Sequence, residues 1–456
     1  MNFFLENMRK KRLFIIFILI LLAFIPDRDI EENEFPLYRV VIDPGHGGIF
    51  LSDKKKHGDK FDMITAEYLD YYAEGAIYKK IYEHKLMYNI ALRTIDLLSY
   101  CAKEGDFEKF KNILKKYTSD PIKKIYIETH ISRENALTEE QIKTSEDPNA
   151  PYRLYDFPDL TGNMVKGRIS KINELKPHLV VSLHCAASAP PEYKGMNGII
   201  VPPYNVLKKG FLRLQTEETW KKLNDNNILE SWFRKSNRKS YKFYFYKDCA
   251  QYFTALGITK NYQLDKSNYY GYKYNMITWR YSDKPYWDIT AEKHGDYSKY
   301  SSNINTFIEK GDYWEREQSL YEEYRRGSGF RDFGGDNYFA TYEIIKYIFL
   351  SLNTTASNPK NKVPGKPFIS TWSVPLLINA ISAYIELGYL DRKWDREVLL
   401  YRQAEVAEGV AIGVYSLLAG MDPIKIKIKH RPSGKAIDLK KYNITKEKSY
   451  FDIVTE

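Results

Sequence analysis

Residues 40–48 read VVIDPGHGG, and this stretch decides the fold class. The β-branched run from Val40 to Ile42 has no polar interruption, a pattern typical of a strand that is buried on both faces of a parallel sheet. A proline and Gly45 end the strand, so His46 stands at its carboxyl end between glycines. Ligands bind at that edge of open α/β sheets, and flanking glycines allow close approach to the backbone. Both a ligand-binding histidine and a turn histidine fit this stretch.

A second buried strand ends in the same way. Residues 179–188 read LVVSLHCAAS and place His184 after an apolar run, so the two histidines are expected at one sheet edge. Glu83 opens a segment, residues 83–100, whose apolar residues recur at helical spacing, which puts its carboxylate in the first turn of a helix beside the strands. Two histidines and one carboxylate are a common zinc-binding set. The alternative role of Glu83 is a favourable interaction with the helix dipole.

Further periodic segments complete the fold class. KKIYIETH (123–130) alternates as a strand does, a helix is expected around residues 165–175, and apolar residues from Ala404 to Leu418 recur at helical spacing. This alternation predicts an α/β fold with an open, mostly parallel twisted sheet flanked by helices. IKIKIK (424–429) predicts an edge strand with alternating lysines.

Residues 204–370 differ from both flanking segments, because tyrosine, tryptophan, phenylalanine, lysine and aspartate are abundant there. We expect an inserted Tyr/Trp-rich subdomain of short strands and loops, followed by a helix through YEIIKYIFLSL (342–352). Its aromatic side chains either line a sugar or peptide groove or form the core of a small domain.

The N-terminus has the layout of a secretory signal. A basic stretch, residues 9–12, precedes an apolar run from Leu13 to Ile25. This run is shorter than the ~20 residues of a spanning helix and is apolar all round, which favours a signal peptide or membrane anchor in residues 1–30 over a buried helix. We therefore expect an exported protein of the periplasm or cell envelope, tethered to the membrane through residues 13–25 if the signal is retained.

The composition limits which classes of partner the chain can bind and which types of side chain can hold a metal. A formal net charge of +10 favours acidic partners. We exclude nucleic acid, because the lysines are scattered and an export signal removes the opportunity. The three cysteines, Cys101, Cys185 and Cys249, permit at most one internal disulfide and lack metal-site spacing. A metal must therefore be held by histidine and carboxylate side chains.

Four segments in this order, VVIDPGHGG, YEHKLMYNIAL, VVSLHCAAS and YIELGYL, resemble the zinc-dependent N-acetylmuramoyl-L-alanine amidases, the cell-wall hydrolase amidase type 3 family. The resemblance implies that His46, Glu83 and His184 bind Zn²⁺ and that Glu386 is the catalytic carboxylate. Arg168 matches a recurrent arginine of the family, for which a structural role is expected.

The resemblance also implies a reaction, hydrolysis of the amide bond between N-acetylmuramic acid and L-alanine in peptidoglycan. The chain departs from the family at Ala186, where asparagine is usual, at His130, where arginine is common, and after Glu386, where an asparagine is absent. Two alternatives stay open: a zinc peptidase that acts on another peptide, and a catalytically idle envelope-binding protein. The expected partners are peptidoglycan and either an activator protein or a self-inhibitory insertion.

The sequence patterns, together with the resemblance over residues 36–200 and 371–420, give the expected organisation of the chain. Its parts are a signal peptide or anchor (1–30), the catalytic domain's first part (36–203), the inserted subdomain (204–370), the catalytic domain's second part (371–420) and a C-terminal tail with the edge strand (421–456).

Overall fold

The structure is a computed structural model. It describes residues 35–52, 58, 61–62, 67–68, 72–134, 139–188, 195–200, 333–354, 364–365, 368–369, 374–376, 378–424 and 430–442.

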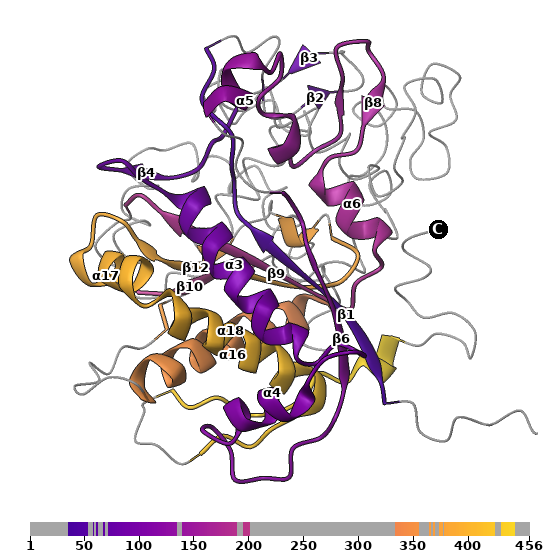
Figure 1. Ribbon diagram of the computed structural model, residues 1–456, viewed down its shortest axis with the longest axis vertical. Coiled ribbons are helices and arrows are strands. Elements are labelled where there is room, and N and C mark those ends of the chain that lie inside the picture. Colours follow the sequence, from indigo (N-terminus) through magenta and orange to yellow (C-terminus); the bar gives the residue numbers. More distant parts are fainter. Residues whose placement is uncertain are drawn as a thin grey trace, which may run out of the picture. The chain divides into compact units, whose positions relative to one another are not determined.

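The central element of these residues is a six-stranded sheet with the order β11-β10-β12-β9-β1-β6 (Figure 1). Its strands are β1 (Leu37–Pro44), β6 (Tyr126–Ile131), β9 (Leu179–Ala186), β10 (Asn197–Ile200), β11 (Phe368–Ile369) and β12 (Ile381–Tyr389). β1 pairs in parallel with β6 and β9, β9 pairs in parallel with β12, and β10 runs antiparallel to β12. The expected open, mostly parallel α/β sheet is confirmed.

Three two-stranded hairpins lie outside this sheet. They are β2–β3 (Phe61–Asp62 and Glu67–Tyr68), β4–β5 (Ile77–Tyr78 and Ile81–Tyr82) and β7–β8 (Phe157–Pro158 and Met164–Val165). The β4–β5 hairpin leads directly into a long helix, so its geometry fixes where that helix begins.

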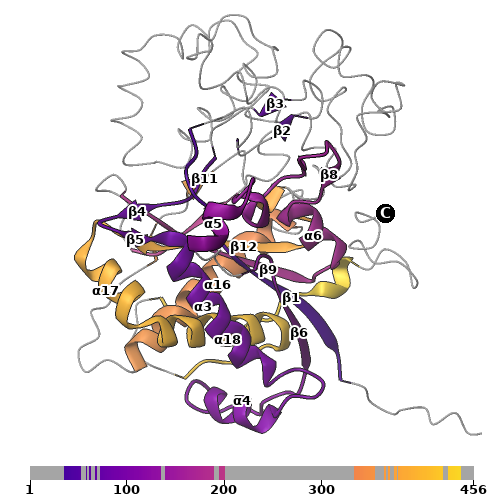
Figure 2. The same cartoon turned by 45° about the horizontal axis from the view of Figure 1, so that its top comes forward.

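Helices flank the sheet. The described α-helices are α3 (Glu83–Ser99), α4 (Phe107–Leu114), α5 (Glu139–Thr144), α6 (Arg168–Glu174), α16 (Phe333–Thr354), α17 (Lys393–Tyr401) and α18 (Gln403–Ala419), and short 3-10 turns occur at Ala150–Tyr152, Val374–Leu376 and Leu439–Tyr442. α3 packs on β1, β6 and β9, α16 packs on β12 and β10, and α18 packs on both α3 and α16 (Figures 1 and 2). The expected helices at 83–100, 165–175 and 404–418 are thus confirmed with small shifts of their ends.

Close packing of α16 on α18 depends on glycine. A Cβ atom at Gly409 would lie 2.4 Å from the Cα of Ile348, and one at Gly413 would lie 3.0 Å from the Cα of Ile344. Only hydrogen at these two positions lets the helix backbones approach so closely. The core that results includes the fully buried strand residues Val40–Ile42.

The helix expected at 342–352, within the range of the inserted subdomain, is part of α16. α16 packs on β12 and α18, and Ile344, Ile345 and Ile348 are fully buried in the same core as the sheet. An apolar helix of this length is stabilised by burial, and the sheet provides the surface for it. The helix therefore belongs with the sheet.

Several expectations concern residues outside the described ranges. They are the signal or anchor at 1–30, the aromatic segment from 204 to 332, and the edge strand at 424–429 except Ile424. Within the described ranges, no helix combines the length and the apolar character needed to cross a membrane. Cys101 and Cys185 are buried free thiols.

Candidate metal centre

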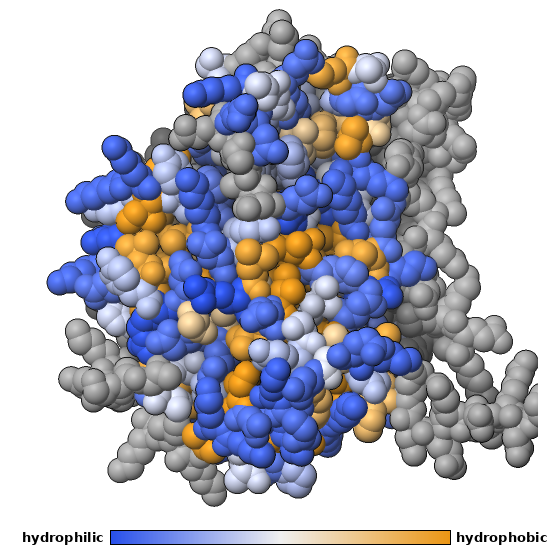
Figure 3. Space-filling model, in the orientation of Figure 1, coloured by the Kyte–Doolittle hydropathy of each residue, from blue (hydrophilic) through white to orange (hydrophobic). Residues whose placement is uncertain are grey.

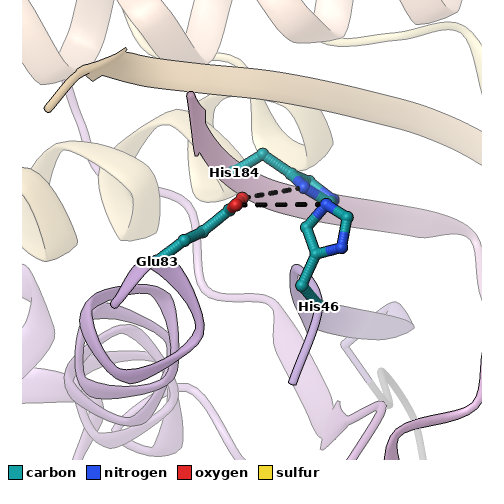
Figure 4. Close-up of side chains that lie close together, drawn as sticks. All are labelled: His46, Glu83 and His184. Carbon is teal, nitrogen blue, oxygen red and sulfur yellow. Dashed lines mark hydrogen bonds and ion pairs between the residues drawn. The ribbon is translucent and has the colours of Figure 1, made fainter. Parts of the chain in front are cut away.

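The fold brings together the three residues expected to bind metal. His46 follows β1, Glu83 is the first residue of α3, and His184 lies near the end of β9 (Figure 4). One ligand atom from each side chain lies within 4.8 Å of the others. The Nδ1 atom of His184 is 3.1 Å from one Glu83 carboxylate oxygen, and the Nε2 atom of His46 is 4.0 Å from the other.

His46 is held in an uncommon backbone conformation, with φ at 55°. Its Nδ1 lies 3.1 Å from the carbonyl oxygen of Ala73, so Nδ1 carries the proton in the neutral ring and Nε2 keeps a lone pair toward Glu83. A Cβ atom at Gly75 would lie 2.7 Å from the Cβ of His46, so the chain can pass there only as glycine. Burial lowers the pKa of His46, which favours the neutral form that binds metals.

Glu83 is buried and is held by backbone donors. The N–H of Ala76 donates to Oε2 at 2.6 Å, and the N–H of Cys185 donates to Oε1 at 3.0 Å. Burial alone raises the pKa of this carboxyl, but His46, His184 and the Ala76 N–H together outweigh burial and lower the pKa to about 2. The side chain is therefore an anion with a fixed orientation, as a metal ligand requires.

His184 is fixed by its neighbours on both sides. Its ring stacks on Tyr384 with centroids 4.4 Å apart and meets the His46 ring edge-on at 5.0 Å. A Cβ atom at Gly45 would lie 2.3 Å from the His184 ring, so the glycine before His46 makes room for the other histidine. Sequence reasoning missed Tyr384, although its position two residues before Glu386 in a strand puts it on the same face.

Glu386 lies on the strand next to His184. In the parallel pairing of β12 with β9, Glu386 is opposite His184 and Tyr384 is opposite Ser182. Its Oε2 atom is buried and has no hydrogen-bond partner among the described residues. Burial and, secondarily, the negative charge of Glu83 raise the pKa of Glu386 to about 8. A carboxyl with this pKa exchanges a proton near neutral pH, which is the property of a general base or acid.

A buried polar network supports the loop that carries His46. Asp43 accepts hydrogen bonds from Ser132 and Ser182 and lies 3.5 Å from Arg168. Arg168 also donates to the carbonyl oxygen of Pro44 at 2.9 Å, which confirms its structural role. The same carbonyl accepts from Arg133, a residue that sequence reasoning missed.

Two residues that depart from the family pattern, His130 and Ala186, lie on strands of the central sheet. His130 on β6 bonds to Glu128 at 2.7 Å. Ala186 pairs with Tyr389 and accepts a hydrogen bond from the Leu390 N–H at 2.9 Å. Both residues have a local role in the fold.

The three side chains fit a zinc ion by the chemistry of their donors. Two neutral imidazoles and one carboxylate form a set that zinc binds while a fourth position stays open. Two observations support this fit. His184 Nε2 is buried without a hydrogen-bond partner among the described residues. The Ala73 carbonyl and the Ala76 N–H bond to His46 and Glu83, as the groups that orient metal-binding side chains commonly do.

No protein-family model matches the chain, and no curated protein sequence matches it. Crystal structures of N-acetylmuramyl-L-alanine amidases resemble it. The amidase from Mycobacterium smegmatis is 12% identical with a TM-score of 0.32, over 84% of this chain and 97% of that chain. The apo amidase from Mycobacterium abscessus is 12% identical with a TM-score of 0.33, over 83% of this chain and 96% of that chain. Likeness at this level does not decide activity.

Proposed function

We propose that this chain is a zinc-dependent amide hydrolase that cleaves the bond between N-acetylmuramic acid and L-alanine in peptidoglycan. The observation that carries the proposal is the register of β12 on β9, which sets Glu386 beside His184, together with the buried Glu386 Oε2 atom, which has no hydrogen-bond partner among the described residues. The ordered motifs of the sequence, rather than the geometry, supply the identity of the bond.

His46, Glu83 and His184 would hold the zinc ion. Zinc bound there would lower the pKa of a water molecule to about 7 and polarise the carbonyl of the amide. The protein keeps its ligands ready, because Ala73 fixes the tautomer of His46 and the N–H groups of Ala76 and Cys185 fix the Glu83 carboxylate.

Glu386 carries the proton in this proposal. Its carboxylate would take a proton from the attacking water, whose oxygen bonds to the amide carbonyl carbon, and would deliver that proton to the leaving amine nitrogen as the C–N bond breaks, which gives a carboxylate and a free amine. Positioned acid–base catalysis of this kind contributes roughly 10²–10⁴ in rate. Burial keeps the pKa of Glu386 close to neutral, so both protonation states are accessible during one turnover. A cation at the neighbouring ligands offsets the charge of Glu83 and favours the basic form of Glu386.

The proposal includes export. The basic stretch and the apolar run at residues 9–25 support an N-terminal signal or tether, which would bring the site to the cell wall. An activator protein or the segment from 204 to 332 remains a candidate regulator of access to the site.

The test is digestion of purified sacculi by the full-length chain with zinc, with a chelator, and as the Glu386→Gln variant. We expect zinc-dependent release of peptides that begin with a free L-alanine amine, identified by mass spectrometry, and glycan strands with a free lactyl carboxylate. Cleavage only within peptides would make the chain a zinc peptidase. Zinc binding without any release would make it an envelope-binding protein.

A further inference from the structure

Two turns beside the metal centre carry a group of basic side chains that the proposed chemistry does not use. We name this group the basic rim; it consists of Lys79, Lys80, Lys85, Arg392, Lys393 and Arg396. The first three belong to the β4–β5 hairpin and the start of α3, and the others belong to the turn after β12 and the start of α17. The two parts touch, because the Arg396 guanidinium lies 5.3 Å from the ring centroid of Tyr78.

The basic rim borders the same edge as the ligands. The hairpin begins after Ala76, whose N–H donates to Glu83, and ends at the residue before Glu83. The other turn is tied to the chain just after His184, since the Leu390 N–H donates to the Ala186 carbonyl at 2.9 Å. Figures 1 and 2 both place β4 next to α17, and Figure 3 shows hydrophilic side chains projecting over this part of the surface.

The hairpin turn has lysines at two positions where asparagine and glycine would have a lower conformational free energy. Ile77 pairs with Tyr82 and Tyr78 with Ile81, so Lys79 and Lys80 form a two-residue loop, with φ of 48° and 66°. Asn-Gly is the favoured sequence of such a turn, whereas a left-handed conformation costs other residues about 1–2 kcal/mol each. Both lysines are exposed and gain nothing from burial. Strain of this kind is concentrated at functional sites.

Two arginines of the basic rim are held in fixed positions. Arg392 lies 4.2 Å from the ring centroid of Tyr389, and Arg396 donates to the Leu390 carbonyl at 2.6 Å. Guanidinium groups held in this way lose little freedom when they bind a carboxylate.

Fewer exposed acidic than basic side chains lie in the segments that form the basic rim, so its net charge is positive. Asp391 and Glu397 are the exposed acids in residues 77–82 and 390–397, and Glu397 is 3.9 Å from Lys393. Asp395 is buried and accepts from the Tyr389 N–H. The surface therefore attracts anions.

We propose that the basic rim binds carboxylates on the peptide side of the substrate, so that the chain selects acidic peptides. This inference rests on the proposed function. A peptide is favoured over the glycan because the lactyl carboxyl of N-acetylmuramic acid is tied up in the amide bond of the uncleaved substrate, which leaves the sugar neutral, whereas side-chain and terminal carboxylates of a peptide match guanidinium and ammonium groups. The substrate's own groups are favoured over a separate anionic polymer, since the basic rim directly borders the ligand edge.

The test measures binding of a synthetic acidic peptide, and of the same peptide with its carboxylates amidated, to the zinc-loaded full-length Glu386→Gln variant. In that background, Lys79→Asn with Lys80→Gly removes two charges while it relieves the turn, so the fold is kept. We expect about fivefold weaker binding of the acidic peptide, by the energy of exposed ion pairs, and no change for the amidated peptide. Arg396→Gln should act in the same direction.

The matched control is Lys109→Gln with Lys115→Gln, at α4, which removes two exposed charges elsewhere. Equal binding by the turn variant and this control would overturn the inference, and so would a loss seen only with an anionic phosphodiester polymer. The two proposals fail separately. If the chain releases nothing from sacculi while peptide binding still depends on the basic rim, the proposed function alone is wrong. If hydrolysis is found and binding ignores the basic rim, this inference alone is wrong.

Discussion

Two glutamates of the sheet domain differ in what surrounds their carboxylates. Glu343 on α16 is fully buried, and its Oε1 accepts from the Ser433 and Gly434 N–H groups and the Ser433 hydroxyl. Glu386 has a buried Oε2 with no partner among the described residues. The first carboxylate ties the segment at 430–442 to the core, and the second is left for a ligand. Both carboxylates are buried, so the presence or absence of hydrogen-bond partners, rather than burial, separates a structural carboxylate from a functional one.

The largest effect is expected on catalysis. Glu386→Gln keeps the shape of the side chain but removes the proton acceptor, so hydrolysis should fall by about 10² or more while zinc stays bound. Rates on sacculi, with zinc content measured on the same samples, check this. Glu343→Gln is the control and should keep its rate per folded molecule. Near-normal turnover by Glu386→Gln would show that another residue carries the proton.

The next effect concerns the space between the two histidines. Gly45→Ala would place a Cβ atom 2.3 Å from the His184 ring, so the ring must move. Zinc affinity, measured by competition with a chromogenic chelator, should weaken by about tenfold, as it does when supporting contacts of a ligand are lost. Gly162→Ala is the control, because its Cβ would meet nothing within 4 Å and the strain from its φ of 85° falls on an exposed turn. Unchanged affinity in Gly45→Ala would contradict the fixed position of His184.

A smaller effect is expected on stability, with opposite signs at the two glutamates. Glu343→Gln weakens bonds to a charged acceptor and should lower the free energy of unfolding by about 1–2 kcal/mol. Glu386→Gln removes the charge of a buried carboxylate whose Oε2 has no partner among the described residues, and should leave the free energy of unfolding of the zinc-free protein unchanged or higher. Urea unfolding at pH 8 measures both. An equal decrease in the free energy of unfolding of both variants would contradict the distinction between a structural Glu343 and a functional Glu386.

The smallest effect is expected in the pH dependence of zinc-free stability. The pKa of Glu386 rises from 4.5 to about 8 on folding, so the native state holds this proton more tightly. The associated stability is fully present below pH 4.5 and is lost as the pH rises to about 8. The pKa of Glu83 falls to about 2, so its contribution is present above pH 4.5 and is lost toward pH 2. Urea unfolding from pH 5 to pH 8 should therefore show a flatter profile in Glu386→Gln, and identical profiles would contradict the raised pKa.

The three residues of the candidate metal centre were predictable because each stands at the end or the start of a periodic element. His46 and His184 follow uninterrupted apolar strands, and Glu83 opens an amphipathic helix. Parallel strands bring such ends to one edge without any knowledge of the loops.

Other features depend on contacts between distant segments. Glu386 was expected only through a short motif, and its place beside His184 comes from the register of β12 on β9. Arg133 and Tyr384 act through a carbonyl and a ring that no local pattern indicates. α16 follows an aromatic-rich segment in the sequence, and its packing on β12 and α18 depends on contacts that no local pattern indicates.

The most direct test of the metal centre is the zinc content of the purified full-length chain after dialysis, compared with His46→Ala and His184→Ala. The account predicts one zinc per chain in the wild type and little in either variant, because two ligands do not retain the ion. Full zinc occupancy in either variant, or none in the wild type after incubation with zinc, would contradict the assignment of His46, Glu83 and His184.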